Sequence, residues 1–327
     1  MSGKALHSWH QKPWQHVQTM LQQSRLPHAL LISGIDGLGK MAFAERLVAS
    51  LLCIQPDAQF NACGHCHSCQ LLAAQSHPDH LLVAPEDRGK QIKVDQIRSL
   101  KQSQTLMPKV SAAKTVLISE ADQMNISAFN SLLKLLEEPQ PDSTLILLSN
   151  NPQQLPITIK SRCQNVVIPI PDTDQAMAYL RAQDPAMQDK HWQALLKLTQ
   201  GAPLAALSLG DAGLEQSRQV TADIALLMQG QGNPVQMAAD WQQYDLKSVL
   251  LQIQSMMQSK IGQLLMTVDN CSVSLLRPYW SIVDCITDTL KLISSQNNPN
   301  KILLIEDFMV TVMQHAEQIH KLQGTHR

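Results

Sequence analysis

Short apolar runs alternate with amphipathic segments over the first half of the chain. Each run is bounded by polar, glycine or proline residues and is typical of a buried strand. The segments between them place apolar residues three and four positions apart, which predicts helices. This alternation predicts an α/β fold with a doubly wound parallel sheet. The expected strands cover residues 28–32, 77–85, 115–122, 144–151 and 166–168.

The pattern changes after residue 168, where strand signals stop and helical spacing continues to the end of the chain. We expect residues 1–168 to form the sheet domain, 169–212 a small helical lid, and 213–327 an all-α collar used for oligomerisation. Methionine-rich stripes in the last part are expected to be core and subunit interface. Cys271 and Cys285 are expected to be buried thiols there.

A glycine-rich stretch, SGIDGLGKM, joins the first expected strand to a helix. Gly34, Gly39 and Lys40 fit the GxxxxGK part of a phosphate-binding loop, in which backbone N–H groups and a helix N-terminus surround an anion. The next residue is Met41, where Ser or Thr would hold Mg²⁺, and a thioether is no ligand for a hard cation. The stretch therefore predicts weak or no nucleotide binding, and an ordinary glycine-rich turn stays an alternative.

The third expected strand ends where nucleotide hydrolases place acidic residues for Mg²⁺ and water. The usual pattern is Asp followed by Glu, but this chain has Ser119 followed by Glu120. Without a metal beside it, Glu120 is expected to cap or pair.

Overall composition restricts the function classes. The 26 Lys and Arg residues nearly balance 27 Asp and Glu residues, which disfavours a chain whose own surface wraps nucleic acid. Apolar runs are too short to span a bilayer, and the first residues lack a signal-peptide core, so a cytoplasmic protein is expected.

Four cysteines follow the helix after the glycine-rich loop. Cys53 stands at its end, and CGHCHSC places Cys63, Cys66 and Cys69 close together. Four thiolates with this spacing predict a closed tetrahedral zinc site with a structural role. Free cysteines, or His65 or His67 replacing one sulfur, are the alternatives. A zinc-dependent DNA-binding module is a further alternative, although the segment lacks a basic run.

Several motifs in a fixed order resemble the AAA+ clamp-loader family over essentially the whole chain. The motifs are RLPHALLISG, the four-cysteine insert, HPD, SLLKLLEEP, LPITIKSRC and a terminal helical collar. The resemblance implies a subunit of the bacterial DNA polymerase III clamp loader, a pentameric ATPase that opens the sliding clamp and places it on primed DNA. It implies hetero-oligomeric assembly with the gamma/tau ATPase and delta subunits, with clamp and DNA reached through the complex and no membrane partner.

The departures from an active ATPase of this family are consistent with one another. Met41 and Ser119 replace the groups that hold Mg²⁺, and Leu204 stands where ATPase subunits carry an arginine that contacts phosphate. The resemblance thus implies a non-catalytic subunit of an enzyme complex, with no intact ATPase or polymerase site of its own. An ATP-hydrolysing motor subunit is the alternative.

Arg162 in the SRC motif matches the residue that, in this family, reaches the ATP held by a neighbouring subunit. A guanidinium offers a fixed fork of donors to the charge that phosphoryl transfer spreads over the γ-phosphate oxygens. The resemblance therefore implies an arginine finger acting in trans. On sequence alone, a solvated loop arginine is the alternative.

Overall fold

The structure is a computed structural model that describes residues 6–87, 90–104, 107–267, 273–293 and 300–324 of the 327-residue chain. It divides into two compact units, Met1–Ser208 and Leu209–Arg327. The expected lid residues up to 208 fall in the first unit, together with the sheet. The expected domain boundaries after residues 168 and 212 stay predictions.

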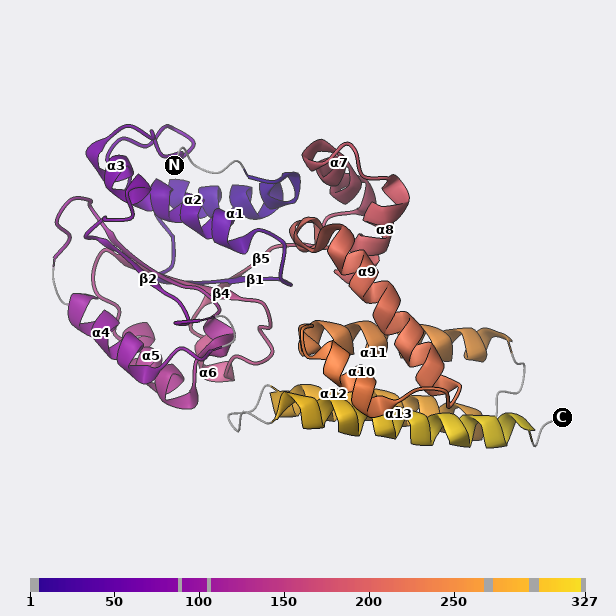
Figure 1. Ribbon diagram of the computed structural model, residues 1–327. Coiled ribbons are helices and arrows are strands. Elements are labelled where there is room, and N and C mark those ends of the chain that lie inside the picture. The colour runs from indigo at the N-terminus through magenta and orange to yellow at the C-terminus, as the bar shows by residue number, and fades with distance from the viewer. Residues whose placement is uncertain (1–5, 88–89, 105–106, 268–272, 294–299, 325–327) are drawn as a thin grey trace. The chain divides into compact units, whose positions relative to one another are not determined.

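Five strands form one sheet in the described part of the first unit, in the order β2-β3-β4-β1-β5 (Figure 1). Every neighbouring pair is parallel, which confirms the predicted α/β fold. The edge strands β2 and β5 flank three strands whose residues are nearly all buried. The strand bounds are β1 Ala29–Ser33, β2 His80–Val83, β3 Lys114–Ile118, β4 Ser143–Ser149 and β5 Gln164–Val167.

Helices cover both faces of the sheet, because alternate strand residues point to opposite sides (Figure 1). Leu30 and Ile32 face the core shared with α1 (Gln11–Gln22) and α2 (Lys40–Leu52). Leu31 faces the core shared with α4 (Val94–Gln104) and α5 (Ile126–Glu137). The two apolar cores fix the sheet and so fix the loops at its edges.

The remaining helices of the first unit are short. Some flank the sheet and others follow it in the chain as the expected lid. They are η1 Ser8–His10, α3 His67–Ala73, η2 Ala121–Gln123, α6 Ile157–Lys160, α7 Thr173–Gln183 and α8 Asp189–Leu198. Helix α9, Pro203–Met228, begins in this unit and continues into the next, with a non-helical backbone at Gly210 (φ 53°).

The second unit is entirely helical in its described residues, as predicted. Its elements after α9 are α10 Pro234–Trp241, α11 Leu246–Thr267, α12 Val273–Ile293 and α13 Lys301–Gly324. Their apolar faces share one buried core around Trp241, Ile253 and Phe308. Cys285 is partly buried against this core, and Cys271 lies outside the described residues.

No helix in the described residues is both long and apolar enough to cross a membrane.

Candidate functional site

The glycine-rich loop connects β1 to α2, as the sequence predicted. Gly39 is the N-cap of α2 and has a left-handed backbone (φ 80°, ψ 27°), which glycine adopts without steric cost. At Gly34 a side chain would place its Cβ 2.8 Å from the Ile168 carbonyl oxygen. Both predicted glycines are therefore required by the loop geometry itself.

Lys40 is the buried cation of this loop, with 6% of its surface exposed. Its Nζ donates a hydrogen bond to the Ile35 carbonyl oxygen at 2.6 Å, so the ammonium points back to the loop. Burial lowers the Lys40 pKa to about 8, although the carboxylates of Asp36 and Asp122 partly oppose this shift. The charge of Lys40 is thus partly balanced within the chain.

The residues beside Lys40 do not assemble the usual magnesium ligands. Met41 packs partly buried against the apolar core under α2. Ser119 is buried, and its hydroxyl faces the Val83 carbonyl oxygen at 3.4 Å. Glu120 has a left-handed backbone (φ 51°) and forms the N-cap position of η2. Three positions around the loop therefore serve packing or local turns.

Asp122 is a residue near the loop that the sequence analysis missed. It lies in η2, beyond the end of β3, and its Oδ1 accepts a hydrogen bond from the Asn150 backbone N–H at 3.1 Å. Its carboxylate also acts electrostatically on Lys40. Strand patterning placed Asp122 at the end of the third strand, but the left-handed Glu120 turns the chain before it.

The start of α9 lies directly against the loop within the first unit. The Leu204 N–H donates to the Gly37 carbonyl oxygen at 3.1 Å. A Cβ at Gly37 would lie only 2.4 Å from the Ala205 Cβ, so only glycine allows this approach. The Leu204 side chain also comes close to Gly39. At Leu204, where the resemblance implies that ATPase subunits carry an arginine, the structure has an apolar contact between the start of α9 and the loop.

Aromatic residues from the N-terminal segment cover the same loop. Trp9 Nε1 donates to the Leu38 carbonyl oxygen at 3.0 Å, and His10 Nε2 lies 2.7 Å from that oxygen. Burial lowers the pKa of His10 to about 4, so its ring is neutral at pH 7. His7 stacks on Trp9, and both contact Tyr179 of α7. These contacts join the N-terminal segment, the loop and α7.

Arg162 lies just after α6, and 37% of its side chain is exposed. Its Nη2 forms an ion pair with Glu137 Oε1 at 2.8 Å, and its Nη1 donates to the Thr158 carbonyl oxygen at 3.0 Å. Ser161 and Cys163 shape the turn: Ser161 Oγ also donates to Thr158, and Cys163 packs partly buried against the core. Arg162 is therefore ordered at the surface.

The glycine-rich loop and Arg162 lie at opposite ends of the sheet's strands. The loop follows the carboxyl end of β1, whereas Arg162 precedes the amino end of β5. These two strands are adjacent and parallel, with Leu30 opposite Gln164 and Ser33 opposite Val167. At about 3.3 Å per residue, the four residues of β5 span roughly 13 Å between these two ends. Arg162 therefore lies at the opposite end of the strands from the glycine-rich loop of its own chain.

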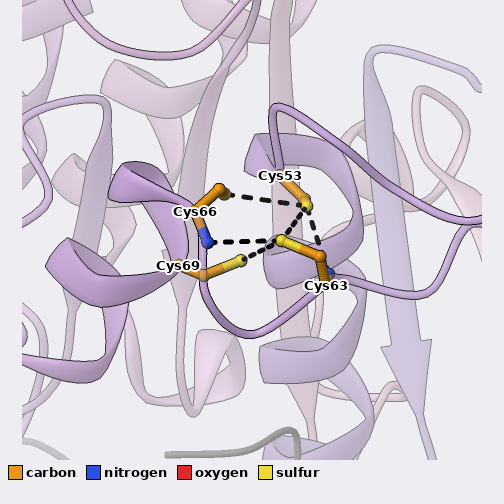
Figure 2. A group of neighbouring side chains, drawn as sticks. All are labelled: Cys53, Cys63, Cys66 and Cys69. Carbon is orange, nitrogen blue, oxygen red and sulfur yellow. Dashed lines mark hydrogen bonds between the residues drawn. The ribbon is translucent and has the colours of Figure 1, made fainter.

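The four predicted cysteines come together beyond the end of α2 (Figure 2). Their sulfur atoms all lie within 4.8 Å of one another. Cys53 Sγ is 3.6 Å from Cys63 Sγ and 3.9 Å from Cys66 Sγ, and Cys63 Sγ is 4.0 Å from Cys69 Sγ. A zinc ion bound at about 2.3 Å would place tetrahedral sulfurs roughly 3.8 Å apart. The cluster fits a four-thiolate metal site.

Backbone groups support the same cluster. The Cys63 N–H donates to Cys53 Sγ and the Cys66 N–H to Cys63 Sγ, each at 3.3 Å. His65, one alternative ligand, is exposed, and its Nδ1 lies 2.9 Å from the Cys63 carbonyl oxygen. The donor set is therefore four sulfurs, and amide N–H groups offset part of the negative charge that four thiolates would carry.

A buried polar network joins the cysteine module to the sheet, and the sequence analysis did not anticipate it. The hydroxyls of Ser68 and Ser111 both donate to the Leu52 carbonyl oxygen, and both contact His77 Nε2. Asp79 accepts three backbone N–H groups from the segment 109–111. The HPD motif could therefore be recognised in the sequence, but the contact of its His77 with Ser111 could not be predicted.

Comparisons with known proteins identify the family. The model of the family described as DNA polymerase III, delta subunit, matches residues 9–172. DNA polymerase III subunit delta′ of Pseudomonas aeruginosa is 38% identical over 237 residues, which are 72% of this chain and 71% of that protein. The chain belongs to the DNA polymerase III delta′ family.

Other delta′ proteins extend this likeness. Delta′ of Escherichia coli is 33% identical over 64% of this chain and 63% of its own length. A gamma-subunit-related DNA polymerase III protein of Thermotoga maritima has a solved structure that matches with 16% identity, over 93% of this chain and 99% of that one, at a TM-score of 0.44. The delta′ family model ends at residue 172, just before α7, so it covers the sheet, the loop, the cysteines and Arg162.

Proposed function

We propose that this delta′-family chain is a non-catalytic subunit of the DNA polymerase III clamp loader that supplies Arg162 in trans to a neighbour's ATP. One observation carries the proposal: Arg162 and the chain's own glycine-rich loop lie at opposite ends of the strands. A partly exposed cation at the opposite end of the strands from its own loop is suited to a nucleotide held by another subunit.

The phosphate loop supports the non-catalytic part of the proposal. Lys40 donates to its own loop, Met41 lies where a hydroxyl would hold Mg²⁺, and Leu204 contacts the loop without a charge. Phosphoryl transfer depends on positive charge and metal at the γ-phosphate, so a loop without these groups gives little hydrolysis. Gly34, Gly39 and Lys40 would hold a nucleotide weakly or not at all.

The chemistry of Arg162 supports the other part. In hydrolysis at the neighbour's site, water attacks the γ-phosphorus, the bond to the β-bridging oxygen breaks, and negative charge spreads over the oxygens. A guanidinium donates to such oxygens from two directions at once. An arginine delivered in trans contributes on the order of 10³-fold or more to the rate, and it makes hydrolysis depend on assembly.

The proposed partners follow from the same assignment. The chain would assemble with the gamma/tau ATPase subunits and with delta, and it would act on the sliding clamp and primed DNA through the complex. A tau/gamma subunit of Haemophilus influenzae is 32% identical over 64% of this chain, which supports a shared subunit architecture.

We also propose that Cys53, Cys63, Cys66 and Cys69 hold one structural zinc ion. All four ligand positions would be filled by protein sulfurs, so the metal would stabilise the module and leave no open position for chemistry. The Ser68–His77–Ser111 network would transmit this order to the end of α2 and to the start of β2.

The test is co-purification with tau/gamma and delta, followed by ATPase assays of the reconstituted complex with wild-type chain and with Arg162→Ala. We expect normal assembly, and a large loss of DNA-stimulated hydrolysis in the variant. Brisk magnesium-dependent hydrolysis by the isolated chain would instead favour the motor alternative. Tight, salt-sensitive DNA binding by the isolated chain would favour the DNA-binding alternative.

A further inference from the structure

The ion pair between Arg162 and Glu137 joins two motifs that are distant in the sequence. Glu137 is the last residue of α5, and Arg162 follows α6. Glu137 Oε1 and Arg162 Nη2 form an ion pair at 2.8 Å, and the Thr158 carbonyl oxygen accepts a hydrogen bond from Nη1 at 3.0 Å. Both oxygen atoms belong to the same chain as Arg162, and together they contact both terminal nitrogens of the guanidinium.

The position of Glu137 is unfavourable for α5 itself. A helix C-terminus carries partial negative charge and is stabilised by cations, so a carboxylate in the last turn is locally destabilising. Glu138 follows at the C-cap position and adds a second negative charge. Glu137 is 51% exposed and could orient into solvent, yet it is directed toward Arg162. The contact with Arg162 offsets the unfavourable placement.

These two contacts leave N–H groups of the Arg162 guanidinium for a further acceptor. A guanidinium has five N–H groups in a planar fork, and the hydrogen bond to Thr158 uses one hydrogen of Nη1. Beside this hydrogen bond and the ion pair with Glu137, the fork keeps N–H groups for another acceptor. An ordered arginine loses less conformational freedom when a phosphate oxygen arrives than a mobile one does.

We propose that Glu137 is a positioning residue that holds the Arg162 guanidinium ready for the neighbour's nucleotide. The inference rests on the proposed trans role of Arg162 and adds a residue that fixes its geometry. Since both partners are partly exposed, the contribution is modest, and we expect about a two- to five-fold effect on turnover.

The experiment compares Glu137→Gln with Glu138→Gln in the complex reconstituted with tau/gamma and delta on primed DNA. The two variants remove the same charge at adjacent exposed positions, and in the structure Glu137 contacts Arg162. We expect Glu137→Gln to lower kcat about two- to five-fold with an unchanged KM for ATP, and Glu138→Gln to match wild type. Thermal unfolding of each variant checks that the fold is retained.

The double variant Glu137→Gln with Arg162→Ala separates positioning from an independent effect. We expect it to match Arg162→Ala alone, because Glu137 would have nothing left to position. A further loss in the double variant would overturn the inference, as would wild-type or faster turnover of Glu137→Gln. If Arg162→Ala itself leaves hydrolysis unchanged, the proposed trans role fails, which is a distinguishable result.

Discussion

Lys40 and Arg162 are two cations of one sheet domain with opposite environments. Lys40 is buried at the carboxyl edge of the sheet, where its ammonium donates to a carbonyl of its own loop. Arg162 is partly exposed at the amino edge and keeps donors beyond its two internal contacts. A cation that satisfies its own chain stabilises a fold, whereas a partly satisfied surface cation can serve another molecule. The comparison agrees with a structural role for Lys40 and supports the function proposed for Arg162.

The largest predicted difference is between Arg162→Ala and Lys40→Met in the assembled complex. We expect Arg162→Ala to lower DNA-stimulated ATP hydrolysis by on the order of 10³-fold, because a trans arginine stabilises the transition-state charge. We expect Lys40→Met to stay within about two-fold of wild type, since its cation acts within the loop. Arg98→Ala, which removes an exposed arginine paired with Asp95, is the control. Equal losses in both variants would end the contrast.

Metal removal should destabilise the end of α2, the helix that begins at Lys40 and ends next to Cys53. We expect about one zinc per chain in the wild type, and a Cys66→Ser variant that loses it. Loss of the metal should lower the free energy of unfolding by at least about 3 kcal/mol, since metal binding contributes directly to folding. Metal analysis and urea denaturation measure both quantities.

Cys285→Ser is the matched control, because Cys285 lies in the helical unit and outside the cluster. It should keep the zinc. The zinc assignment would be contradicted by wild-type protein that folds without metal and whose free energy of unfolding does not change when zinc is added.

A methyl group at Gly37 tests the closeness of the lid contact. Gly37→Ala would place a Cβ 2.4 Å from the Ala205 Cβ at a residue with φ 76°. Overpacking and backbone strain together should cost about 2–4 kcal/mol of unfolding free energy. Gly262→Ala, in α11 with open space around the added methyl, should instead stabilise by about 0.5–1 kcal/mol. Denaturant titrations compare the two, and a neutral Gly37→Ala would show that the lid yields easily.

A smaller effect than that of Gly37→Ala is a pH dependence due to Lys40. Its pKa is lowered to about 8, so the folded state releases this proton before the unfolded state does. The cost of burying the charge is fully present below pH 8 and is relieved as pH rises toward the unfolded pKa. Relative to Lys40→Met, the wild type should gain about 1–2 kcal/mol between pH 7.5 and 9.5. Denaturation at both pH values measures this, and a constant difference would contradict the burial of Lys40.

Much of the fold was predictable from local patterning. Apolar runs such as the one ending at Ile32 correctly predicted the parallel strands, because strands buried on both faces are apolar throughout. The second and third strands are shorter than expected. His77 and Asp79 enter a polar network before β2 begins, and Glu120 turns the chain after β3. Side-chain hydrogen bonds and a left-handed residue limited the strands where hydrophobicity alone did not.

In the candidate site, the sequence predicted the cysteine cluster but not the contacts of the other residues. The spacing of the four cysteines was sufficient to predict that they converge. The ion pair of Arg162 with Glu137, the approach of Asp122 to Lys40 and the Ser111 contact to His77 were not foreseen. Each joins residues at least 25 positions apart, and such pairs depend on how the sheet orders its strands.

The opposite placement of loop and arginine also gives the molecule a direction. With the proposed roles, the chain would donate a cation at one end of its strands and receive none at the other, so its two ends would be unlike, as in head-to-tail assemblies. In a row of related subunits, it could occupy a terminal place and could not propagate the row through further copies of itself. One copy per assembled particle is therefore the stoichiometry that this polarity favours.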